Sequence, residues 1–156
     1  MHGTTWLRSL LAAALIAVPA LAAGACGDDN EEGVDGGEAG VPAIEISGPE
    51  DGDTIEPGDI KVSADVGGFE VVDKLGENPV AGEGHVHFYI DADEIPTAPG
   101  RPAVTADKNT YHAEATTSFT WLGVRPGRHT FGVQLVNNNH TPLEPPVTDE
   151  VSVTVE

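Results

Sequence analysis

Three stretches of this chain alternate apolar and polar residues with a period of two, and this pattern limits the possible fold more than any other feature. The stretches are 44–46 (IEI), 60–66 (IKVSADV) and 151–155 (VSVTV). Successive side chains of a β-strand point to opposite faces of the sheet, so each stretch predicts a strand with one buried face. No window of the sequence shows a sustained helical period. The sequence therefore predicts an all-β domain.

Pairs of turn-forming residues separate the alternating stretches, among them Pro57-Gly58, Gly67-Gly68 and Pro126-Gly127. Short strands divided in this way indicate a β-sandwich. The segment 122–131 (LGVRPGRHTF) also resembles the turn that enters the penultimate strand of immunoglobulin-like and fibronectin-like sandwiches. On that resemblance we expect an antiparallel sandwich of about seven strands, with an additional short strand at 69–72. The seven are expected at 43–47, 60–66, 85–91, 109–115, 117–122, 128–137 and 147–155.

The N-terminal segment has the three-part layout of a secretory signal. Arg8 supplies its strong positive charge, an apolar run follows at 10–21 (LLAAALIAVPAL), and small residues occupy 22–25. A membrane-spanning helix needs roughly 20 apolar residues, so this run is too short to span a bilayer. We therefore expect residues 1–25 to be a signal peptide.

The chain has one cysteine, Cys26, directly after this segment. Residues 23–26 (AGAC) resemble the lipobox of bacterial lipoproteins, although Ala23 stands where that family usually has leucine. The resemblance implies that Cys26 carries a lipid, becomes the N-terminus after cleavage and anchors the protein in a membrane of the bacterial cell envelope, outside the cytoplasm. The alternative is an ordinary secreted protein that is cut before this cysteine.

An acidic, glycine-rich stretch follows at 26–42 and contains few apolar residues. Such a composition buries too little surface to fold, and its like charges extend the chain, so we expect a linker between the lipid and a sandwich domain at 43–156. The formal net charge of the whole chain is −19. This charge excludes nucleic acid as a partner, because nucleic-acid binding needs a basic surface.

Five of the six histidines lie in the expected sandwich domain, at positions 85, 87, 112, 129 and 140. In the strand at 85–91 the apolar residues are out of phase with His85 and His87, which therefore share the opposite face about 7 Å apart. The apolar phase of the strand at 109–115 similarly places His112, with Glu114, on the outer face. Histidine pairs on one strand face are candidate metal ligands.

The alternating strand directions of a sandwich separate these histidines into two groups. The start of the third strand, the turn after the fourth and the loop after the sixth should lie at one end, and roughly 25 Å of strand separates them from His129 at the other. The candidate metal site thus consists of His85, His87, His112 and His140. We expect His129 to be structural, bonded to a backbone carbonyl group.

Each candidate ligand also has a plainer interpretation. His85 and His87 have the spacing of two solvated residues on a strand face, and His112 that of an exposed strand residue. His140, in the segment 137–142 (NNNHTP), has the surroundings of a turn residue. Proximity distinguishes the interpretations: side chains more than about 8 Å apart cannot ligate one ion at about 2.1 Å.

The histidine motifs resemble those of a family of small bacterial exported domains of unknown function. The likeness is carried by 84–91 (GHVHFYID), the PGxHT element at 126–130 and the NxxHxP element at 137–142, and it extends from about Ile44 to the C-terminus. One departure is that AEATT follows His112, where that family has a glycine-rich run. The resemblance implies an exported sandwich and supplies no activity.

The available ligands limit the chemistry of the candidate site. Cleavage before Cys26 would remove Met1, which leaves no thioether for copper(I) or blue-copper chemistry, whereas imidazoles suit zinc and copper(II). The chain has no GxSxG or HExxH element and no cysteine nucleophile, so we do not expect an enzyme. The sequence predicts a lipid-anchored module that binds zinc or copper(II). The alternative is a structural or protein-interaction domain of the envelope, with an envelope protein as its partner.

Overall fold

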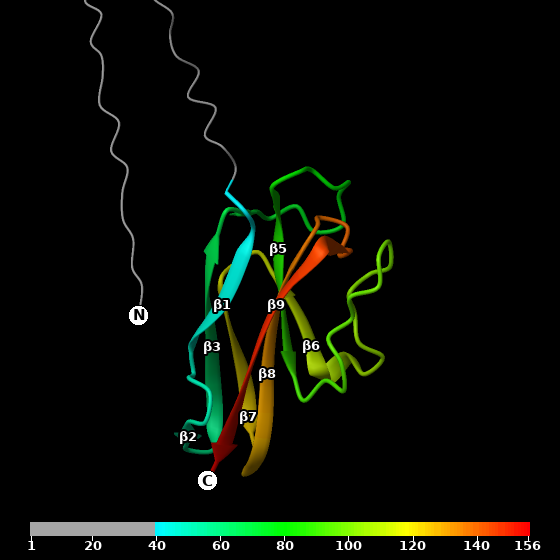
Figure 1. Ribbon diagram of the computed structural model, residues 1–156. Coiled ribbons are helices and arrows are strands. Elements are labelled where there is room, and N and C mark those ends of the chain that lie inside the picture. The colour runs from blue at the N-terminus through cyan, green and yellow to red at the C-terminus, as the bar shows by residue number, and fades with distance from the viewer. Residues whose placement is uncertain (1–39) are drawn as a thin grey trace, which may run out of the picture. The chain divides into compact units, whose positions relative to one another are not determined.

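The computed structural model describes residues 40–156, which form a two-sheet β-sandwich (Figure 1). The predicted signal peptide at 1–25, the lipid attachment point Cys26 and most of the predicted linker at 26–42 lie outside the described residues. Within the described residues, no helix is long and apolar enough to cross a membrane. Every strand pairing of the described residues joins positions between 43 and 155.

The smaller sheet contains three strands in the order β1-β3-β7. These are β1 (Ala43–Gly48), β3 (Gly58–Gly67) and β7 (Ser118–Val124). Both pairings are antiparallel, and the buried residues of β3 alternate with more exposed ones as the sequence predicts. This sheet covers one side of the core.

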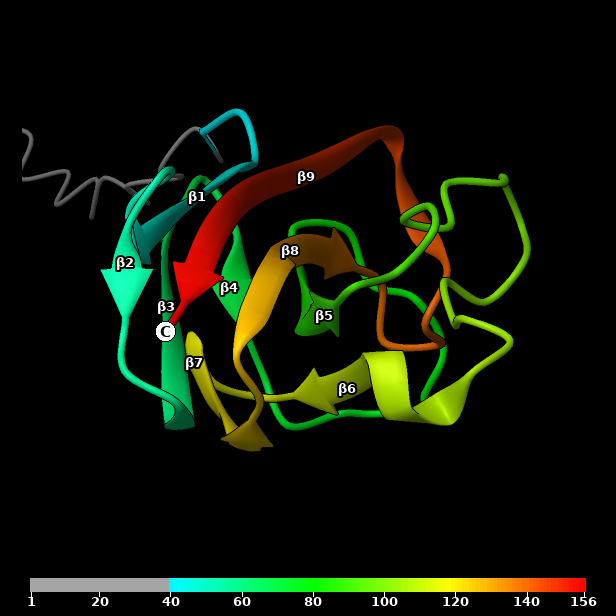
Figure 2. The same cartoon turned by 90° about the horizontal axis from the view of Figure 1, so that it is seen from below.

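The larger sheet has the order β2-β9-β8-β5-β4, with β6 also paired to β5 (Figure 2). Its central strands β5 and β8 run antiparallel, and β8 pairs with β9 along nearly its whole length. The strands are β2 (Thr54–Ile55), β4 (Glu70–Val71), β5 (Glu83–Ile90), β6 (Tyr111–Glu114), β8 (Gly127–Val136) and β9 (Pro142–Val155).

The core lies between the two sheets and is built from aliphatic and aromatic side chains. Burial of such side chains supplies the main driving force for folding, at about 1.5–3 kcal/mol for each large one. The fully buried members of this cluster include Val62, Val86, Phe88, Phe131, Val133 and Leu135. Residues 86 and 88 of β5 face this core, so residues 85 and 87 lie on the opposite face of the larger sheet, as predicted.

All seven predicted strands are present, and the predicted short strand at 69–72 corresponds to β4. The sequence did not predict β2, a two-residue strand that pairs in parallel with β9. A single-turn 3₁₀ helix, η1 (Lys108–Thr110), replaces the first residues of the strand expected at 109–115. The last strand begins at Pro142 instead of residue 147, because Pro142 and Val147 pair with adjacent residues of β8 and the segment between them bulges outward.

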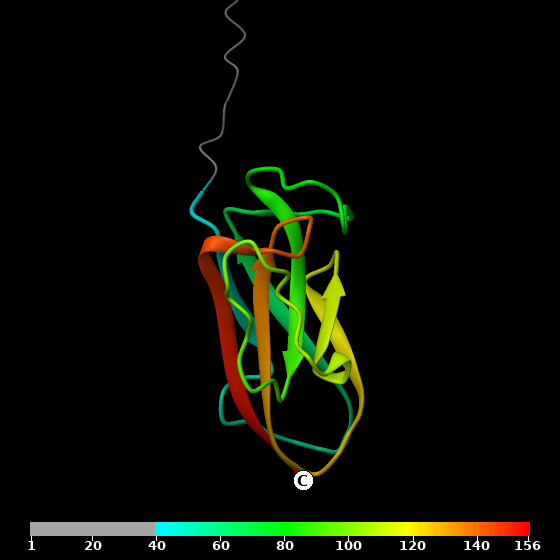
Figure 3. The same ribbon diagram turned by 90° about the vertical axis from the view of Figure 1, so that its right-hand side faces the viewer.

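The outer face of the larger sheet is not left to solvent, because the connection between β5 and η1 folds across it (Figure 3). Ile95 and Ala103 of this connection are buried. Ile95 packs against Gly132 of β8, where an added Cβ would lie 2.8 Å from the Ile95 side chain. The connection encloses the face that carries His85 and His87, and both side chains are fully buried.

Candidate metal centre

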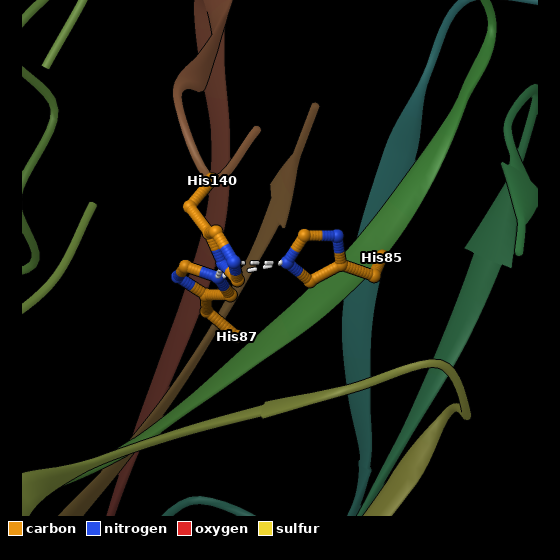
Figure 4. A group of neighbouring side chains, drawn as sticks. All are labelled: His85, His87 and His140. Carbon is orange, nitrogen blue, oxygen red and sulfur yellow. Dashed lines mark hydrogen bonds between the residues drawn. The ribbon is translucent and has the colours of Figure 1, made fainter. Parts of the chain in front are cut away.

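Three histidine side chains converge on one point at the end of the sandwich where β5 begins (Figure 4). The Nε2 atoms of His85 and His87 are 3.1 Å apart, and each lies 3.0 Å from Nδ1 of His140. The three nitrogens therefore form a nearly equilateral triangle. A tetrahedral ion with bonds of 2.0–2.1 Å separates its ligand atoms by about 3.3 Å, so the triangle has nearly the size of one face of such a coordination shell.

The first two histidines come from β5 and owe their direction to its period of two. Residues 85 and 87 lie opposite Val136 and Gln134 of β8, on the face turned away from the core. The strand pairing on both sides holds the backbone of β5, because β6 pairs with residues 86–89. This part of the site is therefore carried by a rigid element, which favours fixed ligand geometry.

The third histidine comes from the loop between β8 and β9. His140 has a positive φ of 66°, a conformation that few residues other than glycine adopt but that histidine tolerates more often than most. Its N–H donates to the Asn137 carbonyl over 2.9 Å, and its own carbonyl accepts the N–H of Ala103 over 2.7 Å. The strained backbone is thus fixed on both sides and holds the ring over β5.

A second set of contacts ties the same loop to the first residue of β5 and to the segment before it. The fully buried Asn138 donates its side-chain amide to Glu83 over 2.9 Å, and its carbonyl accepts the N–H of Gly76 over 2.6 Å. The ammonium group of Lys74 also donates to both carboxylate oxygens of Glu83, each over 2.8 Å. The loop that presents His140 is therefore connected to the strand that presents His85 and His87.

The surroundings of His87 determine which of its nitrogens carries the proton. Its Nδ1 lies 2.8 Å from the Ala103 carbonyl oxygen, which can only accept, so Nδ1 is the donor and Nε2 presents its lone pair to the triangle. Tyr89 donates to the same carbonyl over 2.8 Å and also contacts Gln134. A histidine oriented by such an outer contact is typical of metal ligands.

His85 lacks a comparable outer contact. Its Nδ1 is buried and has no hydrogen-bond partner within residues 40–156. An unpaired buried donor costs about 1–3 kcal/mol, which disfavours the tautomer with the proton on Nδ1 unless something binds the Nε2 lone pair. A cation inside the triangle would stabilise that tautomer.

Burial favours the neutral form of all three rings. It lowers the pKa of His85 to about 4, with a further contribution from His140. Burial likewise lowers the pKa of His87 to about 3, helped by the charges of His85 and His140 and opposed by the bond to Ala103. The pKa of His140 is also lowered by burial. Neutral imidazole is the form that binds metals, so these three rings can ligate without losing protons.

A family model described as a domain of unknown function, DUF4399, matches residues 62–156 of the chain. The match covers more than half of the sequence and contains all three converging histidines. The chain belongs to the DUF4399 family. A search among curated proteins found no match to it.

Two solved structures were found that are similar to the DUF4399 chain. The fibronectin(III)-like modules of Clostridium thermocellum CbhA align with 74% of this chain at 16% identity and a TM-score of 0.41. An engineered protein aligns with 76% of it at 15% identity, also with a TM-score of 0.41. The aligned part spans 46% of the first of these chains and 21% of the second.

His112 does not join the other three histidines of the DUF4399 domain, because the predicted phase of its strand is wrong. His112 lies opposite Phe88, on the face of β6 that turns toward the core, and its ring stacks on Phe119 with centroids 4.0 Å apart. Its Nε2 contacts Glu114 over 2.9 Å. Tyr111 shares the apolar phase of this stretch in the sequence, but in the structure it lies beside Tyr89 on the histidine face and not in the core.

His129 lies at the other end of the DUF4399 sandwich, as predicted. Its Nε2 donates to the Arg125 carbonyl over 2.9 Å, which confirms the expected bond to a backbone group. Its Nδ1 forms an ion pair with Asp91 at 2.7 Å. Both ring nitrogens are used, so His129 has no lone pair to offer an ion.

Sequence reasoning missed the residues that surround the three histidines. Ala103 carries no signal in its side chain, because it acts through its backbone N–H and carbonyl groups. Tyr89 does carry a signal, since it shares the phase of His85 and His87. A polar aromatic residue in phase with a histidine pair on an otherwise buried strand points to a hydrogen-bonding partner of that pair.

Proposed function

We propose that this DUF4399 domain binds one zinc or copper(II) ion through His85, His87 and His140. The observation that carries the proposal is the triangle of imidazole nitrogens, all within 3.1 Å of one another. Three neutral rings have too few protons to satisfy these contacts as hydrogen bonds once Nδ1 of His87 donates to Ala103. A cation bound by three lone pairs satisfies all of them together.

The donor set supports zinc or copper(II) as the ion. Imidazole is a preferred ligand of both, whereas calcium and magnesium prefer oxygen atoms. Neither thiol nor thioether is present among residues 40–156, and copper(I) favours those softer ligands. Zinc fits the size of the nitrogen triangle.

We further propose that the domain serves in binding and not in catalysis. His85 and His87 are fully buried and His140 is partly buried, so little of the triangle faces solvent. A catalytic metal needs an open position that substrate can reach, whereas enclosed ions serve storage, transfer or structure. The burial of most of this triangle therefore favours binding over catalysis.

A lipid on Cys26 would hold this domain at the cell envelope, outside the cytoplasm. The support is the lipobox-like segment 23–26 and the acidic stretch behind it, which suits a tether. Fractionation of a bacterium that produces the full chain tests this part. We expect the protein in the membrane fraction and the Cys26→Ser variant outside it; a wild-type protein that is fully soluble would contradict the anchor.

Titration calorimetry with zinc and copper(II) tests metal binding directly. The material is untagged residues 27–156, compared with the His85→Ala/His87→Ala double variant and with His129→Gln as a matched control from the other end of the sandwich. We expect one ion per chain, an affinity more than about 100-fold lower in the double variant, and no change in the control. Equal binding by wild type and double variant, with both folded by circular dichroism, would refute the site.

A further inference from the structure

One polar side chain beside the histidine triangle has no part in the contacts described so far. Tyr111 begins β6, directly after the η1 turn, and lies opposite Tyr89 on the face that carries His87. Its ring packs edge-on against the His87 ring, with centroids 4.7 Å apart. The side chain is half-buried and its hydroxyl oxygen lies 3.4 Å from Nε2 of His87.

This distance is long for a hydrogen bond and suitable for a pair of ligands. Hydroxyl hydrogen bonds have typical donor–acceptor separations of about 2.7–2.8 Å, and they weaken as the separation grows. Two atoms bound to the same tetrahedral ion are instead separated by about 3.3 Å. The oxygen lies next to the nitrogen that faces the ion, and not next to Nδ1 on the far side of the ring, which is taken by Ala103.

We infer that the phenol oxygen of Tyr111, which lies beside the ligand nitrogen of His87, is the fourth ligand of the ion. This inference rests on the proposed metal site and adds a residue to it.

The chemical step on binding is a simple exchange. Burial raises the pKa of Tyr111, so the phenol would lose its proton only to a bound ion: the oxygen–metal bond would form as the O–H bond breaks, and the proton would leave to solvent through the groove that Tyr111 lines. No electron is transferred, and the ion keeps its oxidation state. The phenolate charge partly offsets the charge of the divalent ion, which favours copper(II) or zinc over a monovalent ion in this buried place.

Copper(II) provides a readout that a merely structural tyrosine would not give. A phenolate bound to copper(II) produces a visible charge-transfer absorption and tyrosine modes in the resonance Raman spectrum. Untagged residues 27–156 loaded with one equivalent of copper(II) should show both signals. Tyr111→Phe, which removes only the hydroxyl, should lose both and bind copper(II) about tenfold or more weakly, still one ion per chain.

The neighbouring variant His112→Gln is the matched control and should keep both the band and the affinity. Wild-type protein that binds one copper(II) ion without a charge-transfer band would overturn the inference and leave the three-histidine site intact. A band that persists in Tyr111→Phe would also overturn it, because Tyr89, the other tyrosine of the chain, would then be its source. Failure of the wild type to bind copper(II) or zinc would refute the proposed function itself.

Discussion

The two ends of the sandwich use histidine in opposite ways. At one end His85, His87 and His140 turn their nitrogens toward one another, and no carboxylate among residues 40–156 joins their cluster. At the other end His129 is paired with Asp91 and a backbone carbonyl. Burial lowers the pKa of the first three rings, whereas the partners of His129 raise its pKa above the ordinary value.

The difference shows that the partner of each nitrogen, and not burial alone, decides what a histidine can do. An acceptor beside each nitrogen, as at His129, favours the protonated ring and leaves no lone pair. An acceptor beside one nitrogen only, as at His87, fixes a neutral ring whose other nitrogen can ligate. The first arrangement stabilises a turn, and the second suits a metal ligand.

The largest expected effect comes from His140→Gly, which removes a ligand without straining the loop. Glycine adopts the positive φ of residue 140 readily, so the metal-free domain should keep its stability within about 1 kcal/mol. The affinity for zinc should fall more than about 100-fold, since loss of a ligand exceeds the effect of losing an outer contact. Calorimetry gives the affinity and thermal unfolding the stability.

The variant His129→Gln tests whether the two ends of the sandwich differ in zinc binding. It should leave zinc affinity unchanged, because this ring lies at the opposite end and both its nitrogens are engaged. If His140→Gly and His129→Gln weakened zinc binding equally, the ion would be held by scattered surface residues and the contrast would be lost.

The next effect concerns the backbone that aligns the metal end. Gly84 is buried, and an added Cβ would collide with the Val136 carbonyl oxygen and lie 2.9 Å from the Phe69 ring. Gly84→Ala must therefore push β5 away from β8 next to the position where His85 pairs with Val136. We expect a loss of about 1–3 kcal/mol in unfolding free energy, measured by urea denaturation, together with weaker zinc binding.

Gly67→Ala provides the matched control for that substitution. A Cβ at Gly67, at the end of β3 in the smaller sheet, meets no atom within 4 Å. Its unfolding free energy should stay the same or rise by up to about 1 kcal/mol, because alanine lowers the entropy of the unfolded chain. An equal loss in both variants would mean that the close approach at Gly84 does not matter.

The period of two in the sequence was sufficient to predict most of the fold and the direction of the histidine pair. The phase of Val86 and Phe88 places His85 and His87 on one face, and strand directions bring the loop of His140 to the same end. The same reasoning failed at 109–115, because Tyr111 is amphipathic and its phase can be assigned to either face.

The sequence could not predict that a loop covers the outer face of the larger sheet, which carries His85 and His87. The connection after β5 has no regular period, so nothing in it indicates that Ala103 reaches His87 or that Ile95 packs on Gly132. These contacts depend on backbone atoms and on the course of a loop. They determine whether His85 and His87 are solvated or enclosed. The alternation of residues in the sequence left open whether these two histidines are solvated strand residues or metal ligands.

The smallest expected effect concerns His129, at the end of the sandwich that carries no candidate ligand. Its contribution to the free energy of unfolding should change with pH in the opposite direction from that of a buried neutral histidine. Burial lowers the pKa of His129, but its bonds to Asp91 and Arg125 and the charge of Asp91 together raise it above the ordinary value of 6.5. The folded protein therefore binds this proton more tightly than the unfolded chain. The resulting stability is fully present below about pH 6.5 and is lost as the pH rises through the folded-state pKa.

Asp91→Asn isolates this contribution, because asparagine keeps an acceptor for the Thr130 N–H while it removes the charge. Urea unfolding of wild type and variant across neutral pH should differ by at most about 1 kcal/mol, since Asp91 is partly exposed and solvent screens the pair. The difference should be greatest at the acidic side of this range and vanish at the alkaline side. A difference that grew with pH would mean that His129 is held neutral, and the contrast with the histidine triangle would then rest on geometry alone.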